Sequence, residues 1–502
     1  MANIRNSTSA IEKLEPQALW GIFAEICAIP HASGSEAALS EYISGFALAH
    51  GCEVKTDKIG NLLLSKAATQ GYENVKSVVM QAHLDMVTQK NSELKFDFLT
   101  DAIEPSIRGN KVTANGTTLG ADNGIGVAAA LAVITADDIQ HGPLQCLFTV
   151  EEETGLFGAA ALTDEFVSAD IMLNLDGEDL KEIYIGCAGG ARTTVIFKFR
   201  PEPPAIDNIG MTVAITGMKG GHSGADINTG RGNAHKELAI FLAQATEKFN
   251  IQLSDIHGGN ADNAIPRESF ATFALPVNEV EALKSFTANY LKKAIGRLGA
   301  RAPEFNLVIK LTNNPELIFP AEFQQKLLKA INESPDGVIA LSKAVPDLVE
   351  TSTTLAIITT TANEVTIKSS QRSAINQHRE HLSKSLLELW SVYGGRGVID
   401  SEYPGWEPRP ESTIITTAVE SYQQQLGFKP QPTAIHAGLE CGIIGDLNPM
   451  MEIISFGPDI NSPHSPDENV DIDSVMNFWT VLVDILSKID KSPKSKVFVG
   501  KM

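Results

Sequence analysis

The stretch VKSVVMQAHLDMV, residues 75–87, decides the fold. Its apolar residues run almost without a break, whereas a half-buried strand would alternate apolar and polar residues. Such a run is typical of a parallel sheet that helices cover on both faces. Two polar side chains, His83 and Asp85, interrupt its end. Because residues i and i+2 of a strand point to the same face, both project together at the carboxyl end, where open α/β sheets place their sites.

Further runs of this kind alternate with helical patterns in the first part of the chain, as in LQCLFTVEE (144–152) and DIMLNLDGE (170–178). Two Pro-rich seams, FRPEPPAIDNIG (199–210) and SEYPGWEPRPEST (401–413), bound a middle segment in which strands alternate more strictly. The pattern predicts an α/β domain with a mostly parallel sheet flanked by helices, interrupted by an inserted α+β domain. We expect the first domain at 1–188 and 402–502, and the insertion, long enough for two similar α+β halves, at 189–401.

Composition narrows the function classes. The 502 residues include 61 acidic and 40 basic ones, and the net charge of -21 argues against nucleic acid and anionic membranes as partners. Five scattered cysteines without a C-x-x-C pair argue against a disulfide framework and a thiolate zinc site, and they favour a reducing compartment. The N-terminal stretch has no signal-peptide pattern, and the longest apolar run, IGVAAALAVITA, is too short to span a bilayer. We therefore expect a cytoplasmic protein.

Three motifs could bind metal. His83 is a candidate ligand with Asp85 as the carboxylate that orients it, although a core histidine capped by an aspartate fits equally well. Asp122, in TLGADNGIGVAAALAVI (118–134), either caps the helix that follows or bridges two cations from a glycine-flanked loop. The acidic run in FTVEEETG (148–155) ends an apolar strand, and neighbouring carboxylates persist in a site only when cations or a shared proton compensate them.

Two single residues complete the set. Asp176 ends the strand pattern IMLNLDGE (171–178), and His464 lies in the loop GPDINSPHSPDE (457–468). Alone they would be a turn residue and a surface histidine. Together the five positions offer nitrogen and oxygen donors without sulfur, which suits zinc, manganese or cobalt. A carboxylate that bridges two such ions is the arrangement of two-metal hydrolases.

The ordered motifs AHLDMV, LGADNG, EEETG, NLDGE and SPHSPDE resemble those of the co-catalytic zinc metallopeptidases that include carboxypeptidase G and peptidase T. The further stretches EIYIGCAGG, MKGGHSGADINTGRGNAHK, NAIPRE and AIHAGLECGII resemble the aminoacylhistidine dipeptidase branch, the bacterial carnosinase type. The resemblance covers essentially the whole chain.

The resemblance implies a role for each position. Asp122 would bridge two divalent ions, with His83 and Asp176 on one and Glu153 and His464 on the other. Glu152 would be the general base, and Asp85 would orient His83. The role split among three consecutive glutamates stays open, because relatives commonly carry Asp where this chain has Glu151.

In the insertion, which would act as a lid, the resemblance implies that His222 stabilises the oxyanion, from its own chain or from the partner of a homodimer. Contacts to the substrate's backbone or carboxylate are implied for Asn263 and Arg372, and a site-lining position for His436, Gly438 and Glu440. The implied activity is hydrolysis of short peptides, dipeptides with C-terminal histidine such as carnosine among them. A tripeptidase, an N-acyl amino acid deacylase and a catalytically silent, metal-dependent peptide-binding protein are the alternatives.

Overall fold

The computed structural model describes residues 10–489, which divide into two compact units. The first unit contains the chain up to Cys187 and, after the insertion, Pro408–Ala434 and the segment from Leu439 onward. The second unit contains Ala188–Glu407 and the short return Ile435–Gly438. No helix within residues 10–489 is long and apolar enough to cross a membrane.

An eight-stranded sheet forms the centre of the first unit, in the order β1-β2-β6-β3-β7-β21-β8-β20. Its inner pairs β6–β3, β3–β7 and β7–β21 are parallel, whereas β1, β2 and β8 pair antiparallel. The predicted α/β class is thereby confirmed, and the parallel pairings lie at the centre of a mixed sheet. The strands are β1 (Glu53–Thr56), β2 (Leu62–Lys66), β3 (Val78–His83), β6 (Leu144–Thr149), β7 (Ile171–Asn174), β8 (Glu182–Cys187), β20 (Gln431–Ile435) and β21 (Glu452–Ser455).

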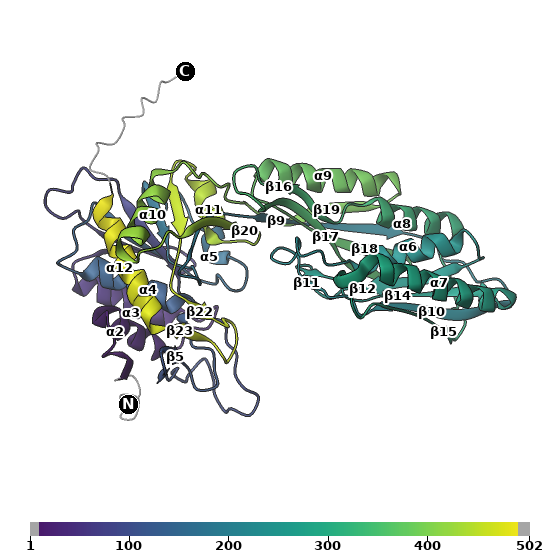
Figure 1. Ribbon diagram of the computed structural model, residues 1–502, viewed down its shortest axis with the longest axis horizontal. Helices are drawn as coiled ribbons and strands as arrows, with labels where there is room; N and C mark the ends of the chain where they lie inside the picture. The colour runs from purple at the N-terminus through teal and green to yellow at the C-terminus, as the bar shows by residue number, and fades with distance from the viewer. Residues whose placement is uncertain (1–9, 490–502) are drawn as a thin grey trace, which may run out of the picture. The chain divides into compact units, whose positions relative to one another are not determined.

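Helices flank this sheet (Figure 1). Every residue of β3 is buried, as the uninterrupted apolar run predicts for an inner parallel strand. Helix α4 packs against β3 and β6 and is covered in turn by α2, while α10 packs against β21 and α12. The helices are α2 (Gln17–Cys27), α3 (Ala37–Ala49), α4 (Ala121–Thr135), α5 (Phe157–Ala160), α10 (Thr413–Gln425), α11 (Glu440–Leu447) and α12 (Ile472–Lys488).

A small four-stranded sheet completes the first unit, with the order β22-β23-β5-β4. It brings the chain near residue 112 beside the chain near residue 470, since Val112 pairs with Val470. Its strands are β4 (Ser106–Arg108), β5 (Lys111–Thr113), β22 (Ile460–Asn461) and β23 (Asn469–Asp471).

The second unit has a nine-stranded sheet whose pairings are all antiparallel. Its path is β15-β10-β14-β12-β17-β18-β9-β19, with β16 beside β17, and a separate pair joins β11 to β13. The strands are β9 (Gly189–Lys198), β10 (Asn208–Thr216), β11 (Gly221–His222), β12 (Gln252–Gly258), β13 (Ala264–Ile265), β14 (Ser269–Pro276), β15 (Asn306–Thr312), β16 (Gly337–Leu341), β17 (Val349–Thr360), β18 (Glu364–Ser373) and β19 (Arg396–Tyr403).

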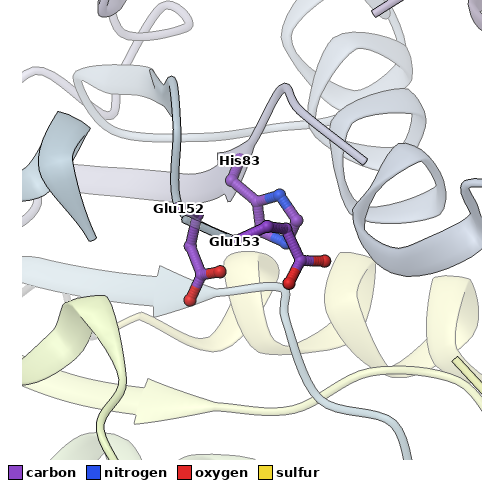
Figure 2. Close-up of side chains that lie close together, drawn as sticks. All are labelled: His83, Glu152 and Glu153. Atoms are coloured by element: carbon purple, nitrogen blue, oxygen red, sulfur yellow. The ribbon is translucent and has the colours of Figure 1, made fainter. Parts of the chain in front are cut away.

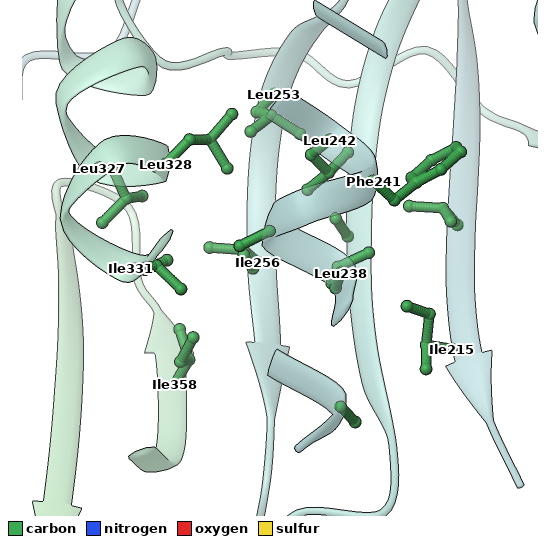
Figure 3. Close-up of a cluster of buried hydrophobic side chains, with 14 of the residues drawn as sticks. Ile215, Leu238, Phe241, Leu242, Leu253, Ile256, Leu327, Leu328, Ile331 and Ile358 are labelled. Atoms are coloured by element: carbon green, nitrogen blue, oxygen red, sulfur yellow. The ribbon is translucent and has the colours of Figure 1, made fainter. Parts of the chain in front are cut away.

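One hydrophobic cluster holds the helices of this unit on its sheet (Figure 3). Leu238 and Leu242 of α6 and Leu327 of α8 pack with Leu253 and Ile256 of β12. Burying each such side chain stabilises the fold by roughly 1.5–3 kcal/mol. The helices are α6 (Ala234–Thr246), α7 (Val280–Leu298), α8 (Ala321–Glu333) and α9 (Asn376–Val392).

Candidate metal centre

Histidine and acidic side chains gather where the inner strands of the first unit end. His83 is the last residue of β3, Glu152 and Glu153 follow β6, and Asp176 follows β7. Because these strands are parallel neighbours, their carboxyl ends meet at one edge. Figure 2 shows His83 at the tip of its strand with the carboxylates of Glu152 and Glu153 beside it.

Two histidines approach the same carboxylate from different directions. Nε2 of His83 lies 3.1 Å from Oδ1 of Asp122 and 3.4 Å from Oδ1 of Asp176. Nε2 of His464 lies 3.2 Å from Oδ2 of Asp122 and 3.0 Å from Oε1 of Glu153. Asp122 thus presents one oxygen to each histidine, as a bridging carboxylate would.

Three groups of side chains in the first unit could each hold a metal ion, with candidate ligand atoms within 4.8 Å of one another. The first is His83, Asp122 and Asp176, and the second is Asp122, Glu153 and His464. The third joins His83 to Glu152 and Glu153. The structure therefore brings all five predicted ligands together, with Glu152 beside them, and none of the three groups includes Glu151.

Asp85 contacts both His83 and the loop that carries the glutamates. Nδ1–H of His83 donates to the backbone carbonyl of Asp85 at 3.0 Å, and Oδ1 of the Asp85 carboxylate lies 3.5 Å from the same nitrogen. The carboxylate accepts hydrogen bonds from the backbone N–H groups of Glu152 and Glu153 and from the Ser33 hydroxyl. Since a carbonyl only accepts, Nδ1 carries the proton and Nε2 is free to bind metal. Asp85 therefore orients the glutamate loop as well as the imidazole.

Negative charge is poorly compensated in this cluster. Burial, followed by repulsion from Asp176 and other carboxylates, raises the pKa of Glu152 well above its usual range. Burial likewise raises the pKa of Asp176 to about 6. Conversely, the neighbouring carboxylates of Asp122 and Glu153 raise the pKa of His464 to about 10. The raised pKa values of the acids and of the histidine have one meaning in common: the cluster carries excess negative charge. Added positive charge would therefore be favourable there.

One buried carboxylate oxygen favours metal ligation. Oε1 of Glu153 is buried and accepts no hydrogen bond from residues 10–489, although it lies 3.0 Å from Nε2 of His464. Two atoms that bind the same cation lie at such a distance from each other, although neither donates a hydrogen bond to the other. Together with the nitrogen and oxygen donor set, this observation indicates that the residues fit divalent cations such as zinc, manganese or cobalt.

Glu440, the first residue of α11, belongs to a buried polar layer beneath the centre. Its Oε2 accepts hydrogen bonds from Gln81 and Thr149, and Asn174 donates to Gln81. Oε1 of Glu440 has no hydrogen-bond partner in the described part of the chain. Gln81 and Asn174 were not predicted. Each is a polar residue in an otherwise apolar strand, two positions before a candidate ligand, and this position could have identified both.

The other predicted residues lie in the second unit. Arg372 is buried and donates to the hydroxyls of Tyr403 and Ser223, at 3.0 and 3.4 Å. Among residues 10–489 no carboxylate pairs with it. Burial, then the charge of Arg372, lowers the pKa values of two nearby imidazoles, that of His222 and that of His436, the latter to about 3. These imidazoles are therefore neutral near pH 7.

His436 and Asn263, two further predicted residues of the second unit, each make a polar contact. Nε2 of His436 is 2.7 Å from the Ser352 hydroxyl, and the carbonyl of Asn263 accepts the N–H of Ser223. At Gly438 an added Cβ would meet the Tyr403 ring at 2.9 Å, so only glycine fits there without movement. Tyr403, Ser352 and Ser223 were not predicted, because hydroxyl residues on strands and loops carry no pattern of their own.

Comparison with known proteins defines the class. Residues 79–488 match Peptidase family M20/M25/M40, so the chain belongs to this family and is a hydrolase of the metallopeptidase class. The cytosol non-specific dipeptidase of Escherichia coli is 42% identical over 483 residues, covering 96% of this chain and 99% of the relative.

Solved structures are similar to this chain as well. An aminoacylhistidine dipeptidase from Vibrio alginolyticus has a TM-score of 0.91 and 41% identity, covering 97% of this chain and 99% of that one. An aminopeptidase PepT from Bacillus cereus, at 17% identity, has a TM-score of 0.56 with 95% and 99% coverage, which shows a shared fold. The predicted family and enzyme class are confirmed.

Proposed function

We propose that this protein hydrolyses dipeptides in the cytoplasm at a centre that holds two divalent cations, zinc first, with manganese or cobalt as alternatives. The observation that carries the proposal is Asp122, whose two oxygens face His83 and His464 separately. His83 and Asp176 would hold one cation with Asp122, and Glu153 and His464 the other. Divalent cations, when bound, polarise a carbonyl group as Lewis acids and compensate these carboxylates.

The chain's own groups would move the proton. Glu152 accepts a proton from the attacking water and passes it to the departing amine, which balances the hydrolysis of one peptide bond. A raised pKa suits both steps, since a general base and acid works best near the operating pH. Asp85 supports this role because it fixes the backbone of Glu152.

Arg372 and His222 would supply substrate contacts from the second unit. Arg372 is a buried cation without a carboxylate partner in the described chain, and its planar guanidinium suits the terminal carboxylate of a peptide. His222 would donate to the oxyanion that forms at the scissile carbonyl. Asn263, His436, Gly438 and Glu440 would shape the site.

Substrate preference is the finer part of the proposal. We propose Xaa-His dipeptides, carnosine among them, as preferred substrates, supported by the likeness to a protein named aminoacylhistidine dipeptidase. The relative from Escherichia coli is named non-specific, which favours a broader range of dipeptides.

The test is hydrolysis by metal-stripped protein after zinc, manganese or cobalt is added back. The panel contains carnosine, Ala-His, Ala-Ala, a tripeptide and an N-acetyl amino acid. We expect no activity without metal and restored hydrolysis of dipeptides, fastest for those with C-terminal histidine. Cleavage of only the tripeptide or the acetylated compound would support a tripeptidase or a deacylase. Metal binding without any cleavage would support a peptide-binding protein and contradict the proposal.

A further inference from the structure

Glu468 is a buried carboxylate that is not among the candidate ligands. The residue is 2% exposed. Oε2 accepts the backbone N–H groups of Leu119 and Gly120, at 2.7 and 3.0 Å, and Oε1 accepts those of Ala121 and Asp122, at 2.8 and 3.3 Å. One carboxylate thus binds four successive N–H groups of the loop that ends at the candidate bridging ligand.

The loop is shaped to hold an anion at this point. Gly120 has a left-handed conformation with φ of 72°, and α4 begins at the next residue. Asp122 and Asn123 have non-helical backbone angles, so the regular part of α4 follows them. Successive N–H groups around a left-handed residue converge on one side and attract negative charge. The chain itself supplies the anion, so Glu468 fixes the backbone of Asp122 rather than leaving it to solvent.

The other end of Glu468 is equally anchored. Its N–H donates to the carbonyl of Ser465, and its carbonyl accepts from the Thr113 hydroxyl. The next residue, Asn469, begins β23 and pairs with Thr113 of β5. His464 lies four positions before Glu468 in the same connection between β22 and β23. Glu468 therefore ties the loop that carries His464 to the loop that carries Asp122.

We infer that Glu468 is a positioning residue that keeps Asp122 and His464 in register and thereby sets the affinity of the Asp122, Glu153 and His464 group for its cation. This inference rests on the proposed two-cation centre. His83 ends a strand of the central sheet and Asp176 follows another, so the other cation depends on Glu468 only through Asp122.

Stepwise cation affinities test the inference. Metal-stripped wild type and E468Q are titrated with Zn²⁺ by calorimetry, after circular dichroism establishes that the variant is folded. The amide of E468Q turns donor hydrogens toward two of the four N–H groups, so the loop shifts. Loss of a partner that orients a ligand costs roughly 10–100-fold in metal affinity. We expect that loss at one cation and a much smaller change at the other.

H464A identifies the affected cation. In the H464A background, E468Q should change the remaining affinity little, because the two substitutions act on the same cation site. E452Q is the matched control, since Glu452 also accepts a backbone N–H and two hydroxyl hydrogen bonds in the first unit but lies outside the three ligand groups. It should leave both affinities unchanged.

Unchanged affinities in folded E468Q, or equal losses at both cations, would overturn the inference. If E468Q does not fold, E468D decides in the same way, because it keeps the charge but draws the oxygens back from the N–H groups. A wild type that binds fewer than two cations would instead refute the proposed function, so the two failures are distinguishable.

Discussion

The two units of this chain hold polar clusters of opposite character. In the first, Asp122, Asp176, Glu152 and Glu153 crowd around His83. In the second, Arg372 is buried beside imidazoles with lowered pKa values and meets no carboxylate in the described chain. An uncompensated buried charge is costly, so each cluster predicts a ligand of opposite sign. Cations suit the first cluster, and the carboxylate of a peptide suits the second.

Removing the proposed general base, Glu152, is the most sensitive test of the acidic cluster in the first unit. E152Q should lower kcat by about 10²–10⁴-fold, because the amide cannot accept the proton of the attacking water. Metal content, measured by elemental analysis, should stay near that of the wild type, since the five proposed ligands remain. The matched control is E151Q, whose position is outside the three ligand groups and which should remain active. Substantial turnover by E152Q would refute the assignment.

The basic half can be tested by changing the cation at Arg372. R372M should raise KM roughly 10–100-fold, because a hydrogen bond to a charged group contributes about 1.5–3 kcal/mol. R372K should lie between R372M and wild type, since lysine keeps the charge but loses the planar fork. Steady-state kinetics with a dipeptide and with its C-terminal amide measure the effect. Equal losses on both substrates would show that Arg372 does not bind the carboxylate.

The sequence predicts the acidic cluster well because its residues sit at fixed places on regular elements. A polar residue that ends an apolar strand must lie at the sheet edge, and the ends of parallel neighbours meet there. His83 and Asp176 could be predicted in this way. The antiparallel pairing of β1, β2 and β8 could not, because residue periodicity says which face is buried but nothing of strand direction.

Contacts through the backbone were harder to predict. Nδ1 of His83 lies 3.0 Å from the backbone carbonyl of Asp85 and 3.5 Å from its carboxylate, and only the carboxylate was considered from the sequence. Glu468 stands in a quoted motif, yet its four N–H partners lie more than 340 residues earlier in the chain. The segment Ile435–Gly438 returns to the second unit although its neighbours belong to the first. Each of these depends on the folded path of the chain rather than on residue type.

The smallest expected effect concerns a carboxylate of the first unit that is well compensated. Glu452 pairs with Lys76 and accepts hydrogen bonds from Ser412, Thr413 and the N–H of Ile414. Although burial opposes it, these partners lower its pKa to about 2 from a usual 4.5. A depressed folded-state pKa stabilises the protein above pH 4.5, and this contribution is lost as the pH falls toward 2.

E452Q removes that titration. After allowance for partial exposure, we expect the variant to be less stable than wild type by about 1–2 kcal/mol at pH 6, measured by urea unfolding of metal-stripped protein. The difference should shrink between pH 4.5 and 2, because only the wild type loses the charged pair. E322Q, at an exposed i,i+4 pair with Lys326, is the control and should not change the free energy of unfolding. If the difference in unfolding free energy did not depend on pH, Glu452 would act through its hydrogen bonds and not through its charge. Charge compensation would then not distinguish Glu452 from the carboxylates of the metal centre.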